Sequence, residues 1–323
     1  MDRCLILYNS PADEALADEI DVLEQVEFVS NGLRELGYKV DYHGLGNDLE
    51  KEIFAISKSG YDFVFNLVEA VYGYAEILHF VPSLLNLWKI PHSGCPADAA
   101  FITANKVYSK KLMKLCGIPI AENHKISNWR ELTIGKKYIL KPVWEDGSVG
   151  INEDSVFIYE GKKPSILEDK VDSHWFIENY LDGREFNVSI IANRKEPLVL
   201  PPAEMTFRDY PENMPKIVSY KAKWEENSFQ YKQSVRSFDT DISEYTINKM
   251  RSIAIDCWHL FNLHGYARID MRTNKEGKLF VMEANANPCI SADSGFVAAC
   301  FHHGLTKKEI IANIISDLNN PKI

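Results

Sequence analysis

The chain has 323 residues, of which 46% are hydrophobic and 25% charged, the composition of an ordinary globular protein with a substantial core. Its formal net charge of -10 and its pI of about 5.5 give no support to nonspecific nucleic-acid binding, which requires a basic surface. The most apolar region, residues 75–87, is interrupted by polar residues and by Pro82, and it is too short and too polar to span a bilayer. The six cysteines are scattered without a CxxC motif, and no signal peptide is apparent, which predicts reduced thiols and a cytoplasmic location.

Strands and helices are expected to alternate at the start of the chain. Residues 4–8 are a continuous apolar run, typical of a buried parallel strand. The segments that follow predict a helix over 19–36, a strand over 38–42, a helix over 48–59, a strand over 61–66 and a helix over 77–87. This alternation indicates a small parallel α/β domain over residues 1–98. Ligands bind beyond the carboxyl ends of such strands, so Asn66 and Glu69 are candidate substrate contacts, unless they serve only as local caps.

The next segment combines a lysine-rich helix with a glycine-rich loop. The helix is expected over residues 98–116, and of its lysines we expect Lys110, Lys111 and Lys114 to be solvated. A strand over 137–143 leads into the loop WEDGSVG, and a return strand follows at 155–159. Such a loop beside a strand lysine can lie over phosphates, although many hairpin loops contain two glycines.

The rest of the chain is predicted to be mostly strands, with a long segment between them. Strands are expected at residues 175–181, 185–192 and 198–200, and helices at 242–261 and 307–318. Residues 205–239 are aromatic and charged with little periodicity. A segment this long without regular structure is often a functional lid.

A polar hairpin near the end of the chain is the sharpest local signal. Two strands, at residues 266–271 and 278–284, flank a tight loop. Side chains alternate along a strand, so Arg268 and Asp270 share a face, as do Glu283 and Asn285. We expect Asp270 opposite Val281 and Arg268 opposite Glu283, because a shift of one residue would separate the pairs. Converging oxygen ligands favour a site for hard metal ions, and a charged surface hairpin is the alternative.

Seven segments together resemble the ATP-grasp superfamily and, within it, the D-alanine–D-alanine ligase-like group. In family order they are FNLVEAVYG, IPHSG, NKVYSKKLMKLCGIP, ILKPVWEDGSVGI, FIENYLDGREFNV, YKAKW and RID…EANANP. The resemblance implies an α/β fold in which the small parallel N-terminal domain is followed by two ATP-grasp lobes of α+β character. We expect the central lobe, with the glycine-rich loop, over residues 99–182 and the C-terminal lobe, with lid and metal site, over 183–323.

The resemblance also implies an ATP site. Lys106 and Lys141 would bind the α- and β-phosphates as point charges, and Lys223 would reach the γ-phosphate, with Lys221 as the alternative. Glu178 would accept the adenine amino group, and Glu185 would bind the ribose. The remaining nucleotide contacts would come from the loop that closes over the triphosphate and from the backbone beside the adenine: Glu145, Gly147, Ser148, Gly150, Tyr180 and Leu181.

Two magnesium ions, or manganese in their place, would complete the site in the family pattern. Glu283 would bridge the ions, with Asp270 serving one and Asn285 the other. A substrate carboxylate would attack the γ-phosphate to give an acyl phosphate and ADP, and an amine would then displace phosphate. The catalytic candidates are Arg268, Lys223 and Ser148, and the oxyanion would lie against Arg268 and a backbone N–H near Cys289.

The amino-acid half of the pattern departs from common dipeptide ligases. Gly147 stands where they carry Ser, Trp224 where they carry Tyr or Phe, and Cys289 where they carry Gly. The Glu that holds the first substrate's ammonium has no clean counterpart, although Asp18, Asp21 or Glu24 would be able to replace it. Among the tentative substrate contacts, Glu69 replaces a His, and Ser294 is followed by Gly instead of Leu.

These departures predict a ligase with an altered substrate pocket. Its partners would be a small carboxylate and an amine, such as amino acids or small peptides, with no nucleic acid and no membrane, and the protein would be a monomer or homodimer. Three alternatives remain open at this point: a true D-alanine–D-alanine ligase, an ATP-binding sensor that has lost ligation, and a kinase-like enzyme.

Overall fold

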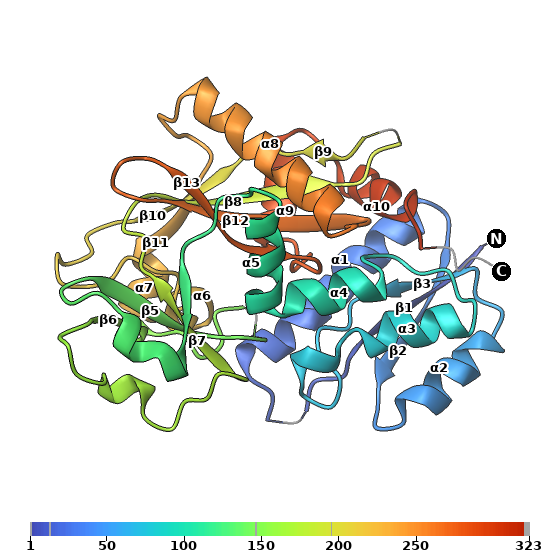
Figure 1. The fold of residues 1–323 in the computed structure, drawn as a ribbon. Helices are drawn as coiled ribbons and strands as arrows, with labels where there is room; N and C mark the ends of the chain where they lie inside the picture. Colours follow the sequence, from blue (N-terminus) through green and yellow to red (C-terminus); the bar gives the residue numbers. More distant parts are fainter. Residues whose placement is uncertain (1, 13, 146, 195, 320–323) are drawn as a thin grey trace.

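A parallel sheet opens the chain in the computed structural model, which describes residues 2–12, 14–145, 147–194 and 196–319 (Figure 1). Its strand order is β2-β1-β3, formed by β1 (Arg3–Asn9), β2 (Lys39–Leu45) and β3 (Phe63–Asn66). Helix α1 (Ala17–Glu35) packs on one face of this sheet, and α2 (Leu49–Ser57) and α3 (Phe80–Leu87) pack on the other. A short 3₁₀ turn, η1 (Ala75–Ile77), precedes α3. The prediction of a parallel α/β unit is confirmed.

The lysine-rich segment is two helices instead of the single one predicted. Helices α4 (Ala97–Ala104) and α5 (Lys106–Leu115) are separated by Asn105, whose ψ of 96° is not helical. The Asn105 side chain accepts a hydrogen bond from the Tyr108 N–H at 2.9 Å and so caps α5. The break makes Lys106 the first residue of α5, and it places Lys110 one turn further on the same face.

The second sheet is antiparallel and carries the glycine-rich loop. Its order is β4-β7-β5-β6, formed by β4 (Asn123–Lys125), β5 (Lys137–Pro142), β6 (Val156–Ile158) and β7 (Trp175–Asn179). Three 3₁₀ turns lie among these strands, at η2 (Ile126–Glu131), η3 (Glu153–Ser155) and η4 (Ser165–Leu167). The core of this lobe lies around Tyr138, Leu140 and Ile177, and from the opposite face of the sheet Ile139 and Lys141 line a cavity.

The third sheet has six strands and forms the floor of the larger lobe. Its order is β11-β10-β8-β12-β13, with β9 beside β8; the strands are β8 (Glu185–Ile191), β9 (Leu198–Val199), β10 (Ala203–Phe207), β11 (Ser234–Ser237), β12 (Tyr266–Thr273) and β13 (Leu279–Asn285). Helix α8 (Glu244–Leu260) covers its outer face, and α4 and α5 pack along β13 (Figure 1). The proposed lid contains two short helices, α6 (Tyr220–Trp224) and α7 (Phe229–Gln233).

The end of the chain returns to the N-terminal sheet. Helix α9 (Gly295–His302), which the sequence analysis did not predict, and α10 (Lys307–Ile315) join the core that α1 forms on that sheet. No helix within the described ranges is long and apolar enough to cross a membrane. The division of the chain at residues 98 and 182 stays a proposal.

The register predicted for the β12–β13 hairpin is wrong by two residues. On the loop side of the hairpin Met271 lies opposite Val281, which is a displacement of one residue. A β-bulge at Met282 adds a second, so Asp270 lies opposite Glu283 and Arg268 opposite Asn285. An even displacement preserves the alternation of side chains, so the polar groups still share a face. The bulge also brings Met282 and Glu283 together on the side of the ligand cavity.

Candidate active site

A cavity of about 570 Å³ lies between the second and third sheets and beneath the proposed lid. Many of the site residues predicted from the sequence line this cavity, although they come from segments far apart in the chain: Lys141, Gly147, Ser148, Tyr180, Leu181, Glu185, Lys223, Arg268, Asp270, Glu283, Cys289 and Ser294. A second hollow, of about 700 Å³, lies around residues 154–166 on the central lobe and contains none of these residues. The cavity between the second and third sheets is therefore the candidate active site.

The floor of the cavity is a chain of alternating charges. Arg268 binds Asp270 through two hydrogen bonds, with its Nε 2.7 Å from Oδ1 and its Nη2 2.7 Å from Oδ2. Asn187 Nδ2 donates to the same Asp270 Oδ1 at 2.8 Å. Lys106 Nζ lies 3.6 Å from Glu283 Oε2. Paired strands thus hold two carboxylates side by side, each facing a fixed cation.

The pKa values of the two carboxylates are shifted in opposite directions. Burial raises the pKa of Asp270, with Arg268 opposing this and Glu283 adding to it. Burial would also raise the pKa of Glu283, but Lys106 and Arg268 outweigh it and hold the value at about 2. Glu283 is therefore ionised at neutral pH. An ionised carboxylate beside a second one is a donor set that suits a hard divalent cation.

Asn285 is less closely associated with this cavity than the two carboxylates. It lies on the same strand as Glu283 but lines a smaller neighbouring hollow of about 40 Å³. Its Oδ1 accepts a hydrogen bond from the Asn287 N–H at 2.9 Å. Its role as a metal ligand stays a prediction.

The glycine-rich loop is in contact with the lid. Gly147 and Ser148 have positive φ values of 64° and 67°, a conformation that glycine adopts readily and serine rarely. Ser148 Oγ donates to the Val218 carbonyl at 2.7 Å, and Trp224 Nε1 donates to the Gly147 carbonyl at 3.0 Å. Lys223 Nζ lies over the Trp224 ring, 4.6 Å from its centroid. Asp146 of this loop lies outside the described residues.

Two further residues predicted at the phosphates, Lys106 and Gly150, are not among the described residues that line the cavity. Lys106 Nζ donates to the Glu145 carbonyl at 2.5 Å, which joins the start of α5 to the beginning of the loop. Gly150 has a φ of 75°, and a Cβ there would come 3.2 Å from the Trp175 ring. Both features fix the ends of the loop and leave its centre facing the lid.

Lys110 is not solvated, so that part of the sequence prediction is wrong. Its side chain is fully buried, and its Nζ lies 2.5 Å from Glu178 Oε2, while Lys141 Nζ lies 2.7 Å from Glu178 Oε1. Helix α5 turns this lysine toward β7 and β13 and leaves Lys111 and Lys114 exposed, as predicted. Burial would raise the pKa of Glu178, but Lys110 and Lys141 together hold it below its usual range.

The end of the cavity next to β7 is partly apolar. Tyr180 and Leu181 line it together with Ile139 and Ile217. Glu185 Oε2 binds Arg272 Nη1 at 3.0 Å, and burial raises the pKa of Glu185 while Arg272 opposes this. Arg272 was not predicted as a site residue, although it lies two residues after Asp270 and four after Arg268, a spacing that places all three on the same strand face.

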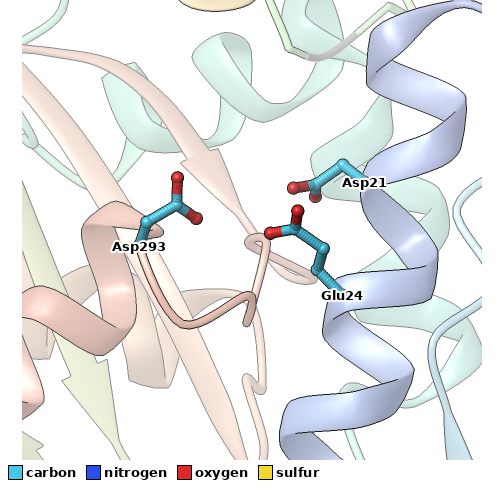
Figure 2. Close-up of side chains that lie close together, drawn as sticks. All are labelled: Asp21, Glu24 and Asp293. Atoms are coloured by element: carbon cyan, nitrogen blue, oxygen red, sulfur yellow. The ribbon is translucent and has the colours of Figure 1, made fainter.

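The opposite end of the cavity carries an acidic group from two distant segments. Asp21 and Glu24 on α1 and Asp293 before α9 bring carboxylate oxygens within 4.8 Å of one another (Figure 2). Asp21 lines the cavity beside Arg236 and Cys289, whereas the side chain of Asp18 is outside the described residues. Of the two alternatives for an ammonium anchor whose side chains are described, Asp21 lines the cavity and Glu24 does not.

The tentative substrate residues lie around this acidic end. Cys289 Sγ donates to Asp21 Oδ2 at 2.9 Å, and burial raises the pKa of the thiol, so it stays protonated. Gln25 Nε2 donates to both Asp21 and Glu69 at 3.0 Å, which makes Glu69 a neighbour of the site instead of a lining residue. Ser294 lines the cavity and also caps α9, accepting from the Val297 N–H at 3.2 Å.

A family model described as D-ala D-ala ligase C-terminus matches residues 120–316, more than half of the chain. The chain belongs to the D-Ala-D-Ala ligase family. The resemblance inferred from its motifs is confirmed, and so is the expectation of an ATP-grasp carboxylate–amine ligase of the D-Ala-D-Ala ligase-like type.

Known proteins similar to this one span most of the chain at low identity. The uncharacterized protein y4sG of Sinorhizobium fredii is 27% identical over 256 residues, 78% of this chain and 73% of that protein. A D-alanine–D-alanine ligase of Pseudoalteromonas translucida is 23% identical over 278 residues, 82% of this chain and 83% of its own. The crystal structure of a D-alanine–D-alanine ligase from Bacillus anthracis, complexed with ATP, shows the same fold, with a TM-score of 0.74 at 18% identity over 98% of this chain and 97% of that one.

Proposed function

We propose that this ligase activates a small carboxylic or amino acid as an acyl phosphate and joins it to an amine other than D-alanine. The observation that carries the proposal is the charge chain Lys106–Glu283 and Arg268–Asp270 at the floor of a cavity whose far end carries both acids and arginines. The charges of the floor suit a metal-bound triphosphate, and the acids and arginines of the far end suit a zwitterion. The proposal on ATP is also supported by the ATP complex of the related Bacillus ligase.

The nucleotide would be bound by fixed positive charge in a protein of net charge -10. Lys141 and Lys223 line the cavity on opposite sides, one on β5 and one on the lid helix α6. They would bind the phosphates, and Lys106 would assist from the start of α5. Tyr180 and Leu181 would border the adenine, and Glu185 would accept from the ribose hydroxyls.

Magnesium fits the donor set of the floor. Asp270 and Glu283 offer carboxylate oxygens from adjacent strands, and Asn285 on the same strand as Glu283 offers an amide oxygen. When bound, the ions would neutralise charge on the phosphoryl group that is transferred. Manganese prefers similar ligands.

The reaction would proceed in two steps. A substrate carboxylate oxygen attacks the γ-phosphorus, the bond to the bridging oxygen breaks, and ADP leaves. The amine nitrogen then attacks the acyl carbon, the resulting tetrahedral oxyanion collapses, phosphate leaves and the nitrogen loses a proton. Arg268, which lines the cavity, would face that oxyanion, and the contact between lid and loop would keep water away from the acyl phosphate.

The acidic end of the cavity favours an amine substrate different from D-alanine. Asp21 would accept the ammonium of the first substrate, while Arg236, whose Nη2 donates to the Asp293 carbonyl at 2.7 Å, would face the carboxylate of the amine substrate. Cys289 occupies the position next to the proposed oxyanion site where common dipeptide ligases carry Gly, and its thiol is already bound to Asp21. This arrangement changes the shape and the charge of the second-substrate pocket.

Product analysis tests the proposal. The protein is incubated with Mg·ATP and pools of amino acids, dipeptides and small acids, phosphate release is followed, and products are identified by mass spectrometry. We expect ADP, phosphate and a new amide, with D-alanine alone a poor substrate. Efficient dialanine formation would indicate a true D-alanine–D-alanine ligase. A stable phosphorylated product would indicate a kinase, and tight ATP binding without turnover a sensor.

A further inference from the structure

Lys110 is a buried lysine that the proposed reaction does not use. It lies on α5 one turn after Lys106, its exposed fraction is 0%, and it is not among the described residues that line the cavity. Its Nζ lies 2.5 Å from Glu178 Oε2 and 3.5 Å from the Val281 carbonyl oxygen. One ammonium group therefore connects α5, β7 and β13, three elements that meet behind the nucleotide cavity.

Glu178 is bound by two lysines that differ in their access to the cavity. Its exposed fraction is also 0%, and its second oxygen, Oε1, accepts from Lys141 Nζ at 2.7 Å. Lys141 lines the cavity, whereas Lys110 lies on the other side of the carboxylate. The three groups carry one negative and two positive charges, so the trio has a surplus positive charge that faces the cavity.

The order of these groups determines how much charge Lys141 can offer a ligand. A buried carboxylate without a counter-ion is very unfavourable, so Glu178 retains any cation within reach. With Lys110 as a permanent partner, Glu178 is neutralised from behind. Without Lys110, Lys141 would be the main counter-ion of Glu178, and its charge toward the cavity would be cancelled.

We propose that Lys110 is a positioning residue that neutralises Glu178 from behind and thereby leaves the charge of Lys141 available to the diphosphate part of the nucleotide. The inference rests on the proposed binding of ATP phosphates by Lys141. It differs from a packing role because it predicts an effect on phosphate binding and little effect on the nucleoside. Val281, two residues before Glu283, also places Lys110 against the strand of the proposed metal site.

Equilibrium binding separates these roles. Isothermal titration calorimetry is performed with Mg·ADP and with adenosine on the wild-type protein and on Lys110→Met, Lys110→Arg and Lys110→Met/Glu178→Gln. We expect Lys110→Met to weaken Mg·ADP binding by about 10- to 100-fold, because the charge of Lys141 toward the cavity would be cancelled, and to change adenosine binding by less than about twofold. Lys110→Arg keeps the charge and should restore most of the affinity.

The double variant is the decisive measurement. It removes the carboxylate charge together with Lys110, so Lys141 is released and Mg·ADP should bind within about fivefold of wild type. Glu178 is fully buried and is not among the described residues that line the cavity, so its substitution removes no side chain from the cavity wall. Lys111→Met, on the exposed side of the same helix, is the matched control and should leave both affinities unchanged.

The outcomes distinguish this inference from the proposed function. Wild-type affinity for Mg·ADP in Lys110→Met, equal losses for adenosine and Mg·ADP, or a double variant as weak as Lys110→Met would each overturn the positioning role. If thermal denaturation shows that Lys110→Met does not fold, the double variant and Lys110→Arg carry the test, and weak Mg·ADP binding by both overturns it. Failure of the wild-type protein to bind Mg·ADP would contradict the proposed nucleotide site, and the inference with it.

Discussion

Trp224 on the lid helix α6 donates its indole N–H to the carbonyl of Gly147, 3.0 Å away in the glycine-rich loop. The lid and the loop come from different lobes, and this bond is reinforced by Ser148 Oγ donating to the Val218 carbonyl at 2.7 Å. Gly147 has a positive φ, and a Cβ at this position would lie 3.6 Å from Lys223 Nζ. That distance is ordinary van der Waals contact, so the positive φ, more than lack of space, favours glycine at residue 147.

Trp224→Phe should weaken this closure without removing the aromatic packing. A net hydrogen bond contributes about 0.5–1.5 kcal/mol, so we expect the KM for ATP to rise by roughly 2- to 10-fold. A looser lid should also admit water to the acyl phosphate, which would raise the ratio of phosphate released to amide formed. Steady-state kinetics with both products measured checks this, with the exposed Tyr245→Phe as control. An unchanged ratio and KM would show that the contact does not control closure.

Glu283→Gln tests the proposed metal site. The substitution keeps the shape of the side chain and removes the charge that faces Lys106 at 3.6 Å. We expect ATP-dependent turnover to fall by at least about a thousandfold, because the metal ions that neutralise charge on the transferred phosphoryl group would lose their main ligand. Thermal denaturation should show a folded protein. Glu276→Gln, in the exposed turn of the same hairpin, is the control, and near-normal turnover in Glu283→Gln would refute the metal assignment.

Arg268→Lys tests whether the paired geometry of the guanidinium matters. Arg268 makes two hydrogen bonds to Asp270, at 2.7 Å each, which a lysine ammonium cannot reproduce. If Arg268 also faces the oxyanion, kcat should fall by about 100- to 1,000-fold while the KM for ATP changes little. Single-turnover measurements of ADP formation and amide formation separate the two steps. A loss confined to ATP binding would place Arg268 in the nucleotide site instead, and Arg251→Lys on the exposed face of α8 serves as control.

The sequence predicted the fold class and most of the residues around the cavity because these depend on local periodicity and on motifs that keep their order. The predictions were wrong where a contact between distant segments determines the strand register or the burial of a side chain. No local sequence pattern indicates the bulge at Met282. The predicted register therefore put the polar side chains on the correct face but paired them with the wrong partners. Lys110 has the pattern of a solvated helix face until α5 is packed against β7 and β13. The acidic group of Asp21 and Asp293 joins the two ends of the chain, which no local pattern indicates.

His264 and Asp317 give the protein a predictable dependence of stability on pH. His264 Nδ1 lies 3.1 Å from Asp317 Oδ1, which joins the loop before β12 to the end of α10. The hydrogen bond to Asp317 raises the pKa of His264; burial would raise the pKa of Asp317, but His264 and the Gly265 N–H hold it below its usual range. The His264 contribution is thus complete below its unfolded pKa of about 6.5 and disappears as the pH rises through the higher folded value.

His264→Gln should therefore lower the melting temperature more in mild acid than in mild alkali. The Asp317 contribution needs an ionised carboxylate, so the pair is strongest between about pH 4 and about pH 6.5. Both side chains are about one-third exposed, and solvent screening keeps such pairs within about 1 kcal/mol, so we expect a loss of roughly 1–3 °C near pH 6 that becomes small near pH 8.5. Differential scanning calorimetry at both pH values, with the exposed His303→Gln as control, checks this. A loss of the same size at both pH values would mean that the imidazole acts through packing, because an ion pair that has lost its proton cannot stabilise the fold.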